Sequence, residues 1–147
     1  MKVGITFNGL DDLLKACEEC ASEAELAHTN RKIVERSTVI LKKAMKERIP
    51  QSADNSKSGR AGIRPGGHAR DNIPVSKIKI EGVTASAEVG WNLGDTSRYF
   101  YMKFVNWGTT KMPPHEFVQS SIDAVEDEIT AIARQEYEDL LKAKIGG

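Results

Sequence analysis

The stretch Tyr99-Phe100-Tyr101-Met102-Lys103-Phe104-Val105-Asn106-Trp107 decides the fold that we predict. Aromatic and β-branched side chains are the ones that strands favour, so residues 99–107 are expected to form the strongest strand of the chain. Pro114 follows after a short loop and stands where helix starts accept proline. The long helix expected there carries apolar residues at spacings of three and four, which places them on one face. They are Phe117, Val118, Ile122, Val125, Ile129, Ile132, Ala133, Tyr137, Leu140 and Leu141.

Another strand and two helical segments are predicted on the N-terminal side. Apolar and polar residues alternate over 2–7, which is typical of a short half-buried strand. Helical spacing over 10–24 and again over 33–45 indicates two segments, which form either a hairpin or one bent helix. Their boundary is expected at His28-Thr29-Asn30, where Thr29 or Asn30 can cap the second segment. Pro50 is expected to end it, because the proline ring removes a backbone donor and clashes with the preceding turn.

A loop and a hairpin are predicted between these helices and the aromatic stretch. Residues 51–72 are polar and glycine-rich, and a loop of this length inside a compact domain is usually functional or disordered. We expect it to be mobile in the isolated subunit, because it cannot bury enough apolar surface to offset its ordering entropy. The runs 75–81 and 83–91 flank Gly82 and indicate a β-hairpin.

These elements predict a single α+β domain over residues 1–147, an ordinary length for one domain. The expected order is β-α-α-β-β-β-α. This order indicates a four-stranded antiparallel sheet, with the two N-terminal helical segments and the long C-terminal helix on one of its faces.

The formal net charge of zero hides an asymmetric distribution. Eleven bases and three acids lie over residues 28–70, which gives +8, whereas three bases and eight acids lie over 115–147, which gives −5. Both runs can be solvated helix faces. Alternatively, the basic region of one subunit meets the acidic last helix of a neighbour, so that copies associate head to tail.

The residues of catalysis and metal binding do not form a recognisable set. Cys17 and Cys20 lack the second pair of ligands that a zinc site needs, so buried small residues are the better interpretation. We find neither a nucleophile elbow nor a Walker loop. The sequence therefore predicts a protein that is not an enzyme, with no cofactor, no metal and no membrane span, made in a reducing cytoplasm.

Basic side chains of the 51–72 loop are candidates for contact with nucleic acid. Aromatic residues do not interleave with them, which argues against a stacking platform for single strands. Flexible, sequence-independent contact with DNA phosphates is the most that the loop supports. The candidates are Lys57, Arg60, Arg64 and Arg70.

Over most of its length, and most strongly from Tyr99 to Val125, the chain resembles the tailed-bacteriophage family of head–tail joining and tail-completion proteins, the gene-product-ten-like minor tail components. The family's aromatic strand, Gly-Thr turn, Met-Pro motif and start of the last helix correspond here to Trp107, Gly108, Thr109, Met112, Pro113, Pro114 and Phe117. Two positions depart from the pattern. Asn106 stands where an acid is common, and Glu116 replaces the usual proline.

The resemblance implies a structural role rather than catalysis. Relatives of this kind are implied to form rings at the neck or the tail top, through which DNA passes. We therefore predict a ring-forming assembly protein of a phage or prophage virion, made in the host cytoplasm and located in the virion neck or tail. Its expected partners are copies of itself, portal, neck or tail proteins, and genomic DNA. The alternative is a small nucleic-acid-binding regulatory protein that uses the basic loop over 51–72.

Overall fold

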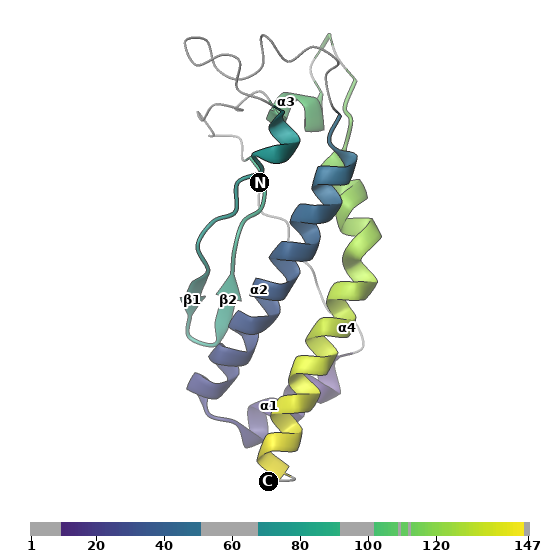
Figure 1. Cartoon of the computed structure of the whole chain (residues 1–147). Coiled ribbons are helices and arrows are strands. Elements are labelled where there is room, and N and C mark those ends of the chain that lie inside the picture. Colours follow the sequence, from purple (N-terminus) through teal and green to yellow (C-terminus); the bar gives the residue numbers. More distant parts are fainter. Residues whose placement is uncertain (1–9, 51–67, 92–101, 109, 112, 146–147) are drawn as a thin grey trace. The chain divides into compact units, whose positions relative to one another are not determined.

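The computed structural model describes residues 10–50, 68–91, 102–108, 110–111 and 113–145 (Figure 1). It is a mostly helical α+β protein with two long helices, α2 and α4, and a small two-stranded sheet. Its elements are α1 (Asp11–Cys20), α2 (Glu23–Arg48), the 3-10 turn η1 (Ala69–Asp71), β1 (Lys79–Glu81), β2 (Thr84–Ser86), α3 (Met102–Trp107) and α4 (Phe117–Ile145).

Contacts divide the chain into two compact units. Of the described residues, unit 1 contains 41–50, 68–75, 89–91, 102–108, 110–111 and 113–124. Unit 2 contains 10–40, 76–88 and 125–145. Helices α2 and α4 each contribute residues to both units, and each unit is described by itself below.

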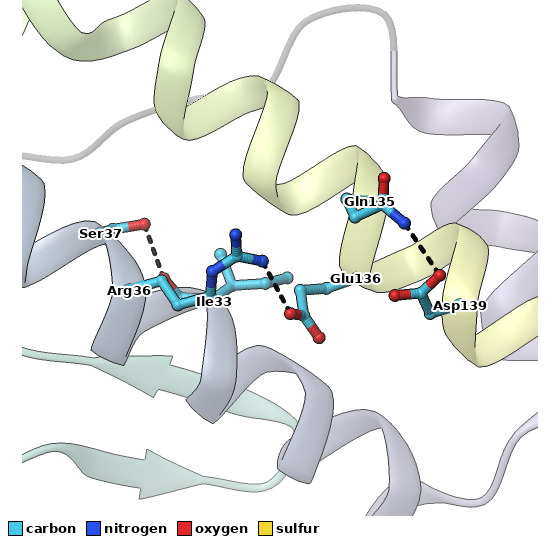
Figure 2. Close-up of polar contacts among 6 residues, drawn as sticks. All are labelled: Ile33, Arg36, Ser37, Gln135, Glu136 and Asp139. Carbon is cyan, nitrogen blue, oxygen red and sulfur yellow. Dashed lines mark hydrogen bonds and ion pairs between the residues drawn. The ribbon is translucent and has the colours of Figure 1, made fainter.

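The core of unit 2 joins α1, the first part of α2 and the last part of α4. Leu10, Cys17, Leu26, Ile33, Ala133 and Tyr137 form its buried cluster. The apolar face predicted for the last helix is confirmed, because all ten of its residues are buried or half-buried. Figure 2 shows one polar contact at the edge of this core, where Arg36 Nη1 of α2 lies 2.9 Å from Glu136 Oε1 of α4.

The predicted boundary between the first two helices is wrong in position. Thr29 and Asn30 lie inside α2, which begins six residues before Thr29, at Glu23. A reciprocal capping pair explains the earlier start: the Glu25 backbone N–H donates to Ser22 Oγ, and the Ser22 N–H donates to the Glu25 carboxylate. Thr29 is buried, and this packing outweighs its modest helix propensity, so the helix continues through it. Helix α2 ends at Arg48, two residues before Pro50, as predicted.

The hairpin around Gly82 is confirmed. Strands β1 and β2 pair antiparallel, with Ile80 opposite Ala85. Gly82 has a φ of +62°, and a glycine with positive φ at the first central position suits a tight two-residue turn. From Val83 to Val89 half-buried residues alternate with exposed ones, as the sequence predicts.

The four-stranded sheet is not found among the described residues, where β1 and β2 form a two-stranded sheet. The strand predicted over 99–107 is wrong from Met102 onward, because Met102–Trp107 form helix α3. Met102 and Asn106 are both buried, and their separation of four residues is a helical period. The aromatic run has no strict alternation to favour a strand. The strand predicted over 2–7 lies outside the described residues.

The last helix begins later than predicted. Its first residue is Phe117, whereas Pro113 and Pro114 lie exposed in the preceding segment. The predicted 51–72 loop overlaps the structure only at its end, where residues 69–71 form η1. Residues 51–67 lie outside the described part, so the expected mobility of the loop stays a prediction.

Candidate functional site

Three hydrogen bonds fold the connection between α3 and α4 into a fixed corner within unit 1. The backbone N–H of His115 donates to Val105 O over 2.9 Å, and that of Glu116 donates to Asn106 O over 3.0 Å. The Asn106 side chain completes the set, because its Oδ1 accepts the backbone N–H of Val118 over 3.1 Å. Asn106 therefore supplies, from another helix, the acceptor that an N-cap residue normally provides.

Phe117 fixes the start of α4 from inside unit 1. Its side chain is 1% exposed, and its ring meets that of Trp91 edge-on, with centroids 6.5 Å apart and an interplanar angle of 82°. This arrangement is favourable for aromatic pairs because the positive ring edge meets the negative face. The Ser121 hydroxyl, also buried, donates to Phe117 O.

The motif residues singled out by the resemblance divide into buried and exposed ones. Phe117 belongs to the core, and Gly108 has a φ of +76°, a conformation that favours glycine. Trp107 is 40% exposed at the end of α3, and Pro113 and Pro114 are also exposed. Thr109 and Met112 lie outside the described residues. The corner thus combines a buried anchor with an exposed indole.

Arg70 is the only one of the four predicted DNA-contacting residues within the described part of the chain. It lies in η1, and its Nε is buried without a hydrogen-bond partner among the described residues. An ion pair of 3.3 Å between Lys46 Nζ and Asp71 Oδ1 links η1 to the end of α2. Lys57, Arg60 and Arg64 lie outside the described residues.

The lysines of α2 belong to the basic region over 28–70 that was predicted to meet an acidic neighbour, but they were not among the predicted DNA-contacting residues. Lys42 and Lys43 are exposed, and neither has an ion-pair partner among the described residues. The sequence shows that Lys42 and Lys43 are adjacent, but many solvent-exposed helices carry such pairs, so the pair alone does not indicate a binding surface. The division into units shows that the basic and acidic residues are separated. The described residues of unit 1 hold seven bases and four acids, whereas those of unit 2 hold nine bases and fifteen acids.

The two cysteines lie at the end of α1 in unit 2. The Cys17 thiol is fully buried and donates to Tyr137 O over 3.5 Å, and its burial raises the pKa of this thiol. Cys20 is half-buried. Within the described residues no three His, Cys, Asp or Glu side chains are placed to share a metal ion.

A second polar arrangement ties three elements of unit 2 together. The Tyr137 hydroxyl of α4 donates to Asn30 Oδ1 over 2.6 Å, and Asn30 Nδ2 donates to Val83 O in the hairpin over 2.6 Å. Burial raises the pKa of the Tyr137 phenol. The amide of Asn30 therefore uses both of its ends, which explains its position inside α2 rather than at a cap.

A protein-family model described as "Bacteriophage HK97-gp10, putative tail-component" matches residues 11–108, about two thirds of the chain. The chain belongs to this family of phage tail components. The match confirms the resemblance recognised in the sequence, and it ends at Gly108, before the Pro-Pro pair and Phe117. No curated protein and no solved structure matches the chain. In the described part of the chain, no helix is long and apolar enough to cross a membrane.

Proposed function

We propose that the protein is a virion-assembly subunit of a tailed phage or prophage, and that it acts at the head–tail junction or the tail end. In this proposal it forms a ring, as a neck or tail-completion component, and DNA passes through that ring. Membership of the phage tail-component family carries the proposal. The role is structural, as is general in that family.

The partners follow from this role. They are other copies of the chain and the portal, neck or tail proteins against which a ring is built. Synthesis in the host cytoplasm and incorporation into the neck or tail complete the proposal.

The separation of charge supports a fixed orientation of the subunit around DNA. Unit 2 carries a net −6 over its described residues, whereas unit 1 carries +3 over its own. A polyanion attracts the basic unit and repels the acidic one. Each exposed ion pair contributes only about 0–1 kcal/mol, so charge alone leaves the free subunit monomeric or weakly associated. Assembly is then expected to wait for a portal or tail end that offers many contacts at once.

Deletion of the gene tests the proposal. Electron microscopy of the mutant lysate should show separate filled heads and tails, or tails of abnormal length. A plasmid copy of the gene should restore joined particles, which controls for effects on neighbouring genes. Normal virions in the uncomplemented mutant would contradict the proposal. A lysate with altered transcription and correctly joined particles would instead favour the regulatory alternative.

A further inference from the structure

Three exposed lysines lie close together on the part of α2 that belongs to unit 1. Lys42 and Lys46 are separated by four residues, so they share a side of the helix within a rise of about 6 Å, and Lys43 lies beside them. Lys46 lies in the last turn, where the helix dipole favours a cation. The helix dipole does not account for Lys42 and Lys43, because they lie before the last turn.

Half-buried Arg70 adds a fourth cation from the adjoining turn η1. The Lys46–Asp71 ion pair shows that η1 lies beside the end of α2, and Arg70 is the residue before Asp71. Its Nε is shielded from solvent, so any contact with a phosphate must come from the remaining part of the guanidinium.

The composition of this surface indicates which kind of anion it suits. Interfaces between proteins are depleted in lysine and enriched in aromatic residues at their centre. Interfaces with DNA are more polar and much more positive. Among the described residues of α2 in unit 1, none is an exposed large hydrophobic, whereas three are exposed lysines. Phosphates therefore suit this surface better than the acidic helix of a neighbouring subunit, which the sequence analysis offered as its partner.

We propose that Lys42, Lys43, Lys46 and Arg70 bind the phosphate backbone of double-stranded DNA without regard to sequence. The inference rests on the proposed function, since it assigns the contact between the subunit and the DNA that passes it. The ion pair of Lys46 with Asp71 is about half exposed on both sides and therefore weak, so Lys46 can turn to a phosphate. Binding of this kind is salt-dependent and lets DNA slide, because its free energy comes largely from released counterions.

The test measures binding of a labelled 20-base-pair duplex by fluorescence anisotropy over a series of salt concentrations. For four phosphate contacts the slope of log K against log salt is expected to be about −3.6. The double variant Lys42→Ala/Lys43→Ala should reduce its magnitude by about 2. Arg31→Ala/Lys32→Ala is the matched control, because it removes two adjacent exposed bases from the same helix within unit 2. The control should leave the slope unchanged.

Two results would overturn the inference. One is an unchanged slope for Lys42→Ala/Lys43→Ala. The other is an equal reduction of the slope in both double variants, because the slope would then depend only on the net charge of the protein. Sedimentation of the same proteins without DNA identifies the competing partner: if the Lys42 and Lys43 variant loses self-association and keeps DNA binding, the surface binds another subunit. The purified chain is used throughout, so these outcomes are independent of the lysate experiment. Separate heads and tails in the deletion mutant with no DNA binding in solution would refute this inference alone.

Discussion

The side chain of Asn106 caps a helix to which it does not belong: its Oδ1 accepts the backbone N–H of Val118, the second residue of α4, over 3.1 Å. The relationship gives a physical reason for the acid that the resemblance leads one to expect at position 106, because a carboxylate oxygen would serve as the same acceptor. Negative charge near a helix N-terminus is favourable.

Two substitutions of Asn106 should therefore show how much the acceptor oxygen, as distinct from the rest of the side chain, contributes to stability. Asn106→Asp is expected to keep or slightly raise the free energy of unfolding, whereas Asn106→Ala should lower it by about 1 kcal/mol, the usual value of a cap. Chemical denaturation at neutral pH measures both. Equal losses for the two variants would show that the acceptor at α4 is not what stabilises this corner.

Glu116, the other departure from the family pattern, has a φ of +55°. A non-glycine residue in this left-handed region costs about 1–2 kcal/mol. We expect Glu116→Gly to raise the free energy of unfolding by up to about 1 kcal/mol. Proline cannot adopt this φ and would also remove the N–H that donates to Asn106 O, so Glu116→Pro should cost about 3 kcal/mol or more. Thermal melts of both variants check the opposite signs; a harmless proline would refute the described corner.

The sequence predicts helices here better than strands, for a reason visible in particular residues. The face from Phe117 to Leu141 repeats a helical period over many turns, so its interpretation does not depend on any one residue. The stretch 99–107 offers only composition, and buried Met102 and Asn106 show that tertiary packing overrides β propensity there. The Asn30–Tyr137 bond joins residues 107 positions apart, and no local pattern indicates it.

Tyr137 should make stability depend on alkaline pH. Burial raises its pKa in the folded state above the unfolded value of about 10, so its contribution is fully present below pH 10 and is lost as pH rises through the folded pKa. At pH 8, Tyr137→Phe should lower the free energy of unfolding by about 1 kcal/mol, through loss of the bond to Asn30. The difference between wild type and variant should shrink as pH rises beyond 10. A difference constant up to pH 11.5 would contradict this assignment; the other tyrosines are common to both proteins and cancel.

The two cysteines should differ in reactivity. The buried Cys17 thiol has a raised pKa and therefore little of the nucleophilic thiolate at pH 8, whereas Cys20 is half-buried. A thiol reagent such as DTNB should react with one thiol quickly and with the other only as fast as the protein opens. Cys20→Ser should remove the fast phase, and Cys17→Ala the slow one. Equal rates in the native protein would show that Cys17 is not protected as described.

The last prediction separates the architectural part of the family motif from its surface part. Phe117 is buried against Trp91, so Phe117→Ala should lower the free energy of unfolding by about 3–5 kcal/mol. Trp107 is 40% exposed, and Trp107→Ala should change stability far less. Exposed tryptophans are frequent anchors at protein interfaces, so the folded Trp107→Ala subunit is expected to complement the deletion mutant poorly, giving fewer joined particles than wild type. Val39→Ala is the control, because Val39 is 70% exposed and lies outside the motif. Full complementation by a stably folded Trp107→Ala subunit would mean that the motif stabilises the fold and does not contribute a contact to assembly.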